Sequence, residues 1–200
     1  RVQNHYRGDV TLQNIKIHPL TTDRWMDLVT LFGEHGAQGG CWCMWWRSRP
    51  KDYDSNVGGR NEYAFKDLVD SKQPVGLLAY INRQVVGWCS VAPREQLVRV
   101  RTSATWRPVD ELPVWVISCF FIDREYRGRQ ITKQLLLNAI NYARKSGAIA
   151  IEAYPKDMTH AVKRDKDRSL YFGTTKMFKE AGFEEVIRRH PSFPIMRLWL

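Results

Sequence analysis

The fold is constrained most by an unbroken apolar run. This run leads into a basic turn and then into a long amphipathic segment. Residues 114–122 read VWVISCFFI, which is typical of a strand buried on both faces of a sheet. A turn at 123–128 follows, and we expect a helix from about residue 129 to residue 146, ended by Gly147. A buried strand joined to such a helix predicts an α/β layer structure.

The remaining elements are expected on both sides of this unit. Residues 10–18 alternate like a strand, and helices are expected at about 21–32 and 61–71. Strands at 75–81 and 84–91 form a hairpin around Asn82 and Arg83, because asparagine tolerates the positive φ of a two-residue turn. A strand at 148–154, a helix at 170–181 and a hairpin of 183–189 with 193–200 complete a mixed sheet flanked by helices. We expect residues 1–200 to form a single domain.

Charge and cysteine usage bear on partners and location. The formal net charge of +10 favours polyanionic partners, either nucleic acid or a small ligand rich in phosphate. No apolar run is long enough to cross a membrane, and no signal peptide is recognisable. We therefore expect a cytoplasmic protein whose four cysteines are reduced thiols. Whether the chain forms a homodimer stays open.

The turn before the long helix has the composition of an anion site. It contains Arg124, Arg127, Gly128 and Arg129. A helix N-terminus adds unpaired backbone N–H groups and the positive end of the helix dipole, so phosphate is the natural ligand. The alternative is an ordinary turn with solvated arginines.

The segment 39–47, GGCWCMWWR, concentrates cysteine and tryptophan. Cys41 and Cys43 are one residue too close for the usual zinc spacing, and no second pair follows them. The C-x-x-C spacing of redox motifs is missing as well. We expect no metal site here, which leaves packing or ligand contact as the role of the tryptophans.

Residues 119–137, CFFIDREYRGRQITKQLLL, resemble motif A of the GNAT superfamily of N-acetyltransferases. That motif joins a central strand to a turn of pattern Arg/Gln-x-x-Gly-x-Gly/Ala and a helix, and RGRQIT at 127–132 stands in its place. The element order and the ending MFKEAGF at 177–183 resemble the family too. The resemblance covers about residues 10–200 and implies the GNAT acyl-CoA N-acyltransferase fold. Gln130 and Thr132 replace two family glycines, and we expect helical φ/ψ angles there, which suit any L-residue.

The resemblance implies acetyl-CoA as the cofactor and transfer of its acetyl group to a primary amine of a small molecule or peptide by direct attack. The alternative is an acetyltransferase for aminoacyl-tRNA or another nucleic-acid-linked or protein amine, or a non-catalytic GNAT-like binding protein. In the family the motif strand splays from the next strand, and its backbone pairs with the pantetheine arm. The implied cofactor residues are Phe120, Phe121, Ile122, Arg127, Gly128, Arg129, Gln130, Ile131 and Thr132.

The implied catalytic groups depart from the family pattern. The usual acid is a tyrosine four residues before the glycine of the last helix, and Phe178 stands there. Tyr154 and Tyr171 are the candidate substitutes. For the base we favour Glu152, which alternation places among alanines on a central strand, where its pKa would rise. The alternative interpretation of Glu152 is a carboxylate paired with an arginine.

In GNAT folds the connection between the first two helices overhangs the acceptor side of the cleft. The resemblance therefore implies that Trp42, Trp45 and Trp46 enclose the acceptor and that Arg47 anchors a negative group on it. Glu34, at the end of the first helix, is a further candidate on this side. The alternative is a hydrophobic plug between helices and sheet, and we expect at least one tryptophan in each role.

Overall fold

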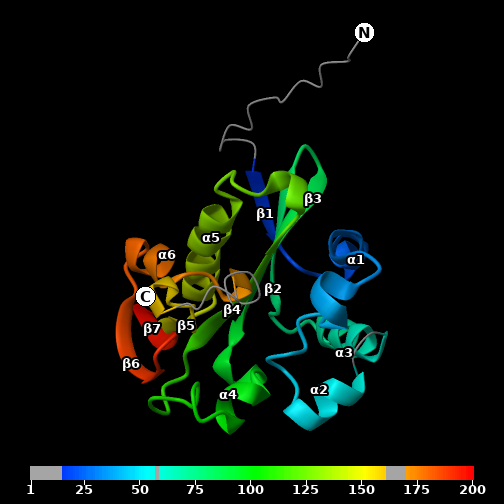
Figure 1. Cartoon of the computed structure of the whole chain (residues 1–200). Coiled ribbons are helices and arrows are strands. Elements are labelled where there is room, and N and C mark those ends of the chain that lie inside the picture. The colour runs from blue at the N-terminus through cyan, green and yellow to red at the C-terminus, as the bar shows by residue number, and fades with distance from the viewer. Residues whose placement is uncertain (1–14, 57–58, 161–169) are drawn as a thin grey trace.

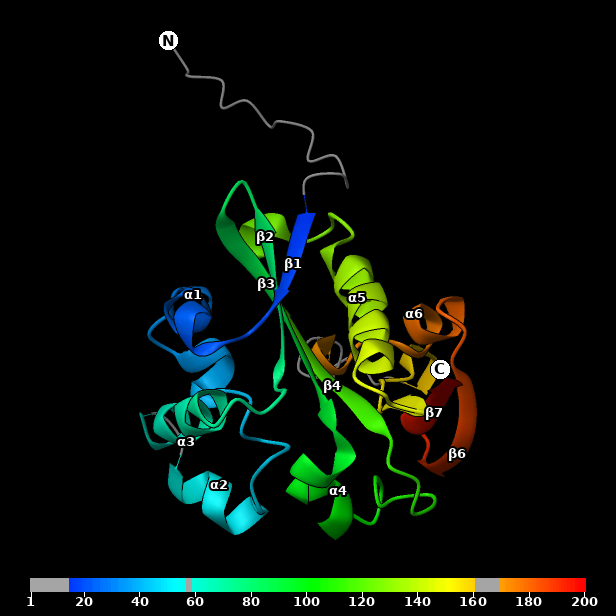
Figure 2. The same cartoon turned by 180° about the vertical axis from the view of Figure 1, so that it is seen from behind.

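A seven-stranded mixed sheet organises the chain (Figures 1 and 2). The computed structural model describes residues 15–56, 59–160 and 170–200. The strand order is β1-β2-β3-β4-β5-β7-β6, and among these described strands β4 and β5 are the one parallel pair. The strands are β1 Ile15–Pro19, β2 Gly76–Ile81, β3 Gln84–Pro93, β4 Trp115–Ile122, β5 Ala150–Ala153, β6 Glu184–His190 and β7 Phe193–Trp199. The predicted mixed sheet is confirmed.

Helices cover both faces of the sheet (Figures 1 and 2). On one face α5 packs so closely on β3 that a Cβ at Gly87 would lie 3.1 Å from Ile131 and 3.2 Å from Leu135. On the other face α1 and α3 share a core with β2, β3 and Trp42. A third buried cluster lies under α4 and contains Trp46 and Tyr154. The helices are α1 Trp25–Phe32, α2 Pro50–Asn56, α3 Gly59–Asp70, α4 Val98–Thr102, α5 Ile131–Lys145 and α6 Thr175–Glu180.

The two parallel strands separate halfway along β4. Residues Trp115 to Ile117 pair with Ile151 to Ala153, and no β5 partner follows for the rest of β4. The register of β3 against β4 also shifts between Ser90 and Val91, which marks a bulge in β4 at this point. The expected splay is confirmed, and it leaves the second half of β4 bordering an opening in the sheet.

Several predicted boundaries are wrong. The segment 170–181 is not one helix, because Gly173 adopts a φ of 73° and divides a short 3-10 turn, Leu170–Phe172, from α6. The helices α2 and α4 were not expected. The first strand begins at Ile15, and the predicted residues 10–14 lie outside the described part of the chain. The hairpin at Asn82 and Arg83 is confirmed, since both residues have positive φ.

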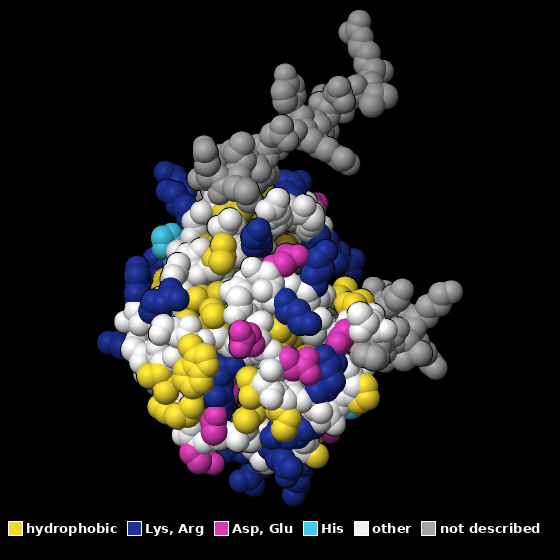
Figure 3. All heavy atoms as spheres, turned by 90° about the vertical axis from the view of Figure 1, so that its left-hand side faces the viewer, with side chains coloured by type: hydrophobic (Ala, Val, Ile, Leu, Met, Phe, Trp, Pro, Cys, Tyr) yellow, Lys and Arg dark blue, Asp and Glu magenta, His cyan; other side chains and the backbone are white. Residues whose placement is uncertain are grey.

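Surface charge is mixed on the side of the molecule formed by α6, β6 and β7. Figure 3 shows lysine and arginine side chains spread over this face with acidic and apolar side chains between them. The described residues of this face therefore form no continuous basic stripe. In the described ranges, no helix combines the length and the apolar character that a membrane crossing needs.

Candidate functional site

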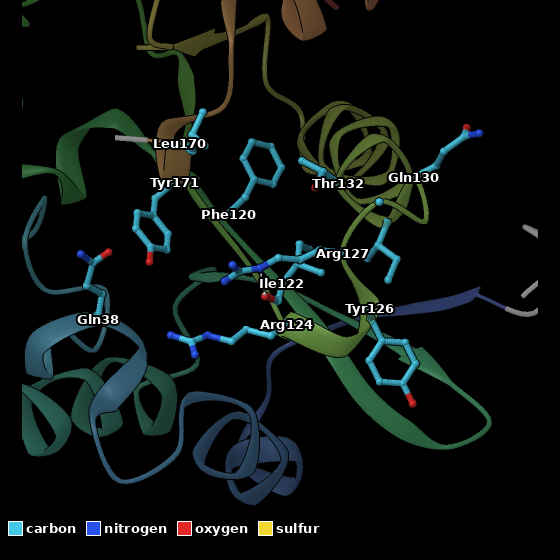
Figure 4. Close-up of a pocket in the computed structure, with 12 residues that line it drawn as sticks. Gln38, Phe120, Ile122, Arg124, Tyr126, Arg127, Gln130, Thr132, Leu170 and Tyr171 are labelled. Carbon is cyan, nitrogen blue, oxygen red and sulfur yellow. Dashed lines mark hydrogen bonds between the residues drawn. The ribbon is translucent and has the colours of Figure 1, made fainter. Parts of the chain in front are cut away.

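Two neighbouring cavities lie at the unpaired half of β4. The larger has a volume of about 560 Å³ and the smaller about 270 Å³. Gln38 and Tyr171 line both, so the cavities adjoin each other. The larger cavity is lined by Gln38, Phe120, Ile122, Arg124, Tyr126, Arg127, Gly128, Gln130, Ile131, Thr132, Leu170 and Tyr171 (Figure 4). The smaller is lined by Phe32, Ala37, Gln38, Cys41, Cys43, Trp45, Trp46, Tyr53, Cys119, Phe121, Tyr171 and Phe172.

The alternation of β4 divides its residues between the two cavities. Phe120 and Ile122 line the larger cavity, whereas Cys119 and Phe121 line the smaller one. Successive side chains of a strand point to opposite faces, so one strand supplies both walls. All three residues predicted on β4 therefore border a cavity.

The larger cavity has a basic rim at the start of α5. Arg124 and Arg127 project into it, as Figure 4 shows, and Arg127 is held by a hydrogen bond of 3.2 Å from its Nε to the carbonyl oxygen of Ile122. Gly128 has a φ of +78°, and a Cβ there would meet no atom within 4 Å, so its backbone faces open space. Arg129 does not line the cavity; its guanidinium lies 5.0 Å from the centroid of the Tyr126 ring.

The helix α5 begins two residues later than expected. Gln130 is left-handed, with φ 59° and ψ 13°, and it caps the helix that starts at Ile131. The expectation of helical φ/ψ angles at both replaced glycines is therefore wrong at Gln130 and correct at Thr132. A left-handed non-glycine residue is uncommon, and at Gln130 the backbone accepts strain that glycine would avoid.

The tryptophans of GGCWCMWWR have different roles. Trp42 is a core residue, because its ring stacks on Trp25 at 5.9 Å and only 4% of the residue is exposed. A Cβ on Gly36 would lie 2.3 Å from Trp42 Nε1, so the tight loop before Trp42 requires glycine there. Trp45 and Trp46 line the smaller cavity. The expected packing role is thus confirmed for Trp42, and contact of Trp45 or Trp46 with an acceptor stays a prediction.

Two predicted acceptor contacts lie elsewhere. Arg47 is buried and donates hydrogen bonds to Gln96 Oε1 at 2.7 Å and to the Val75 carbonyl at 3.3 Å, so its guanidinium does not reach the cavity. Burial lowers the pKa of Arg47 to about 10, which leaves it charged at neutral pH. Glu34 is exposed and lines neither cavity. Neither prediction agrees with the geometry.

Glu152 and Tyr154 belong to a buried ion network. The carboxylate of Glu152, fully buried, lies 2.5 Å from Arg197 Nη2 and 3.4 Å from Arg94 Nη1. The Tyr154 hydroxyl donates to Glu152 at 3.1 Å, and Asp110 binds Arg197 at 2.7 Å. Neither Glu152 nor Tyr154 lines either cavity. The geometry thus favours the second interpretation of Glu152, a carboxylate paired with arginine, over a role as base.

Tyr171 is the predicted catalytic residue that the structure brings to the site. Its ring is parallel to that of Phe121 within 7°, with the centroids 6.5 Å apart. Figure 4 shows its hydroxyl pointing into the space between Gln38 and Arg127. Partial burial raises the pKa of Tyr171, against the opposing effect of Arg127 and Arg124, so the hydroxyl keeps its proton at neutral pH.

Sequence reasoning missed part of the smaller cavity. Gln38, Tyr53 and Phe172 come from the loop after α1, from α2 and from the turn before α6. None of these segments carries a motif, and only the tertiary fold brings them together. The cysteines Cys41, Cys43 and Cys119 also border this cavity.

Comparisons with known proteins agree with this geometry. A family model described as "Acetyltransferase (GNAT) family" matches residues 42–164, which is more than half of the chain. A search among curated proteins finds no match.

Solved structures share the fold at low sequence identity. The PaiA N-acetyltransferase of Thermoplasma acidophilum, in complex with coenzyme A, is 15% identical with a TM-score of 0.53, over 93% of this chain and 99% of that chain. The polyamine N-acetyltransferase of Drosophila melanogaster, which forms N-acetylagmatine, is 11% identical with a TM-score of 0.55, over 93% and 100%. YncA of Salmonella typhimurium, a putative acetyltransferase with acetyl-CoA, is 16% identical with a TM-score of 0.52, over 94% of each chain. With this fold and the family match over more than half of its length, the chain belongs to the GNAT family of acetyltransferases.

Proposed function

We propose that this chain transfers the acetyl group of acetyl-CoA to the primary amine of a small molecule. The observation that carries the proposal is the pair of adjoining cavities at the open half of β4. The larger one is basic, and the smaller one is compact and largely aromatic. A cofactor and an acceptor bound in them would meet beside Tyr171 and Gln38.

The larger cavity fits the cofactor that the family implies. Arg124, Arg127 and the N-terminus of the 15-residue helix α5 supply positive charge and free N–H groups for phosphates. Gly128 has no atom where a Cβ would lie, so a pyrophosphate could approach its backbone. When bound, acetyl-CoA supplies an acetyl group activated as a thioester.

The open half of β4 would hold the arm of the cofactor. Beyond Ile117 the strand has no β5 partner, so its backbone groups on that side can bind a ligand, except the Ile122 carbonyl, which accepts from Arg127. A backbone N–H among Phe120, Phe121 and Ile122 would also stabilise the negative charge that develops on the thioester oxygen.

Tyr171 is the proposed general acid. Phe178 at the usual tyrosine position has no proton to give and is fully buried, 6.2 Å from the Phe120 ring. Tyr171 borders both cavities and is protonated at neutral pH, so it can donate a proton to the departing thiolate.

Deprotonation of the acceptor needs no side-chain base in this arrangement. The described residues that line the two cavities include no carboxylate and no imidazole. An apolar cavity disfavours the ammonium form and lowers the pKa of a bound amine. The acceptor can therefore release its proton to solvent on entering and react as the neutral amine.

Binding of acetyl-CoA to the wild-type chain, followed by thermal unfolding, tests this function. At millimolar acetyl-CoA we expect clear stabilisation, because a ligand that binds only the folded state raises its stability. Arg124→Gln and Arg127→Gln should each weaken binding about tenfold, the effect of losing one charge-assisted hydrogen bond. Arg144→Gln, at the exposed far end of the same helix, is the matched control and should bind like the wild type. No shift at millimolar acetyl-CoA would overturn the proposal.

A further inference from the structure

The smaller cavity is aromatic on nearly every side. Trp45, Trp46 and Phe172 pack against one another, with ring centroids 4.7 to 5.8 Å apart. Phe121 and Tyr171 lie parallel at the side shared with the larger cavity. No described residue that lines this cavity is an aspartate, glutamate, lysine, arginine or histidine. The walls thus offer mainly apolar surface, with the polar groups of Gln38, Tyr53 and Tyr171, and no counter-ion.

Positive charges stand behind these walls. The Arg99 guanidinium lies 4.1 Å from the centroid of the Trp45 ring, and its Nε donates to the Trp45 carbonyl at 2.6 Å. Arg47 is buried behind Cys43, over the ring of Phe65. The positive charges of Arg99 and Arg47, close to Trp45 and Cys43, oppose the binding of a further positive charge in the cavity.

Two of the three thiols of the cavity carry no charge at neutral pH and so supply no counter-ion. Burial raises the pKa of Cys41 to about 11, and a hydrogen bond to Cys43 raises that of Cys119 well above its ordinary value, so both are neutral at pH 7. The same hydrogen bond lowers the pKa of Cys43. The Cys43 sulfur already accepts a hydrogen bond from Trp88 Nε1 at 3.0 Å and lies near the positive charge of Arg47. These two groups therefore compensate negative charge on Cys43.

Two acidic groups lie outside the walls of the cavity. Glu152 lies beyond Tyr154, whose ring is 5.4 Å from that of Trp46, and two arginines bind its carboxylate. Asp54 does not line the cavity and compensates part of the Arg99 charge. A cationic group held between these walls would meet no carboxylate among the described residues that line the cavity.

We propose that the acceptor is a monoamine with a compact aromatic or apolar body, and that the site discriminates against polyamines and other dications. This rests on the proposed function. An aromatic body gains burial and ring contacts in a cavity of about 270 Å³. A second ammonium or guanidinium group would lose its hydration without a counter-ion, which costs more than such contacts return. The inference separates this chain from the structurally similar enzyme that forms N-acetylagmatine.

Matched amines test the acceptor class. Release of free thiol from acetyl-CoA is measured with 2-phenylethylamine and hexylamine as monoamines, and with agmatine and 1,5-diaminopentane as dications. We expect kcat/KM for 2-phenylethylamine to exceed that for either dication at least about 100-fold, because the buried second charge stays unpaired. Hexylamine should fall between them, since it lacks the aromatic contacts.

A variant of the cavity tests whether its aromatic wall causes the preference for an aromatic monoamine. Trp45→Leu should raise KM for 2-phenylethylamine about tenfold and leave the stabilisation by acetyl-CoA unchanged. Trp199→Leu is the control, because Trp199 is 61% exposed and lines neither cavity. The acetyl-CoA measurement also shows that the variant is folded.

The outcomes separate this inference from the proposed function. If acetyl-CoA stabilises the protein and dications are acetylated as well as 2-phenylethylamine, the inference is wrong and the proposed function stands. Turnover of neither class in a protein that binds acetyl-CoA also overturns the inference. Failure to bind acetyl-CoA at all contradicts the proposed function itself.

Discussion

At the scale of single residues, the position of Tyr171 decides what the site can do. Tyr171 is not part of a family motif, yet it borders both cavities and keeps its proton at neutral pH. Phe178, where the family usually has its acid, fills the core between Phe120 and Phe183 instead. We infer that the acid function has moved from the last helix to the turn that precedes it.

Replacing Tyr171 with phenylalanine keeps the ring and removes the proton donor. We expect kcat to fall about 100-fold with little change in either KM, since general acid catalysis contributes about this much. In the wild type, burial raises the Tyr171 pKa above its ordinary value of 10, so the acid is lost only when the pH rises past that raised value. The kcat of the wild type should therefore hold up to pH 10, as steady-state assays across pH will show.

The matched control for this variant is Tyr63→Phe, because Tyr63 is 74% exposed on α3. It should leave kcat unchanged. If Tyr171→Phe also keeps the wild-type kcat, the proton for the thiolate comes from water and Tyr171 only shapes the cavities.

At the scale of elements, the sequence predicted what periodicity and composition encode. The strand β4, the hairpin of β2 and β3 and the helix α5 follow from alternation, turn residues and an amphipathic stripe. The helix α2 buries none of its residues, so it has no apolar pattern to find. The left-handed conformations of Gln130 and Gly173 leave no trace in the apolar periodicity, and they shifted the start of one predicted helix and divided another.

The same reasoning applies to the site. The basic turn and the cavity residues of β4 were predicted because they are contiguous in the sequence. The smaller cavity was predicted only in part, because Trp45, Tyr53, Cys119 and Phe172 come from four separate segments. Arg47 was placed in the site from the position of its segment in GNAT folds, and Glu152 from the alternation of its strand, but both are buried among their own partners.

The turn before α5 permits a test of backbone strain. Gly128→Ala should lower the free energy of unfolding by about 1–2 kcal/mol, because alanine pays for a left-handed backbone even where its Cβ meets no atom. Gln130→Gly should leave stability unchanged or raise it by up to about 1 kcal/mol, since glycine relieves the same strain. Urea unfolding of the two variants compares these effects; a loss of stability in Gln130→Gly would contradict the left-handed conformation at that residue.

At the scale of the whole molecule, ion pairs connect the strands at one end of the sheet, whereas β4 and β5 separate at the other end. Arg94 at the end of β3, Asp110, Glu152 on β5 and Arg197 on β7 form one network beside the paired half of β4. The other half of β4 has no β5 partner and borders both cavities. The network therefore holds the strands in place where they meet, so that their separation beyond that point can serve ligand binding.

Replacing Glu152 with glutamine tests whether this carboxylate serves the fold or the chemistry. Glu152→Gln removes the buried one of the two carboxylates that Arg94 and Arg197 share and leaves them with Asp110, and we expect the free energy of unfolding to fall by about 3 kcal/mol. The pH profile of kcat/KM for the folded variant should keep the shape of the wild type. Glu180→Gln, at an exposed pair with Lys176, is the control and should change stability by less than about 0.5 kcal/mol. If Glu152→Gln retains full stability but loses the acid limb of the pH profile, Glu152 is the base and the network is secondary.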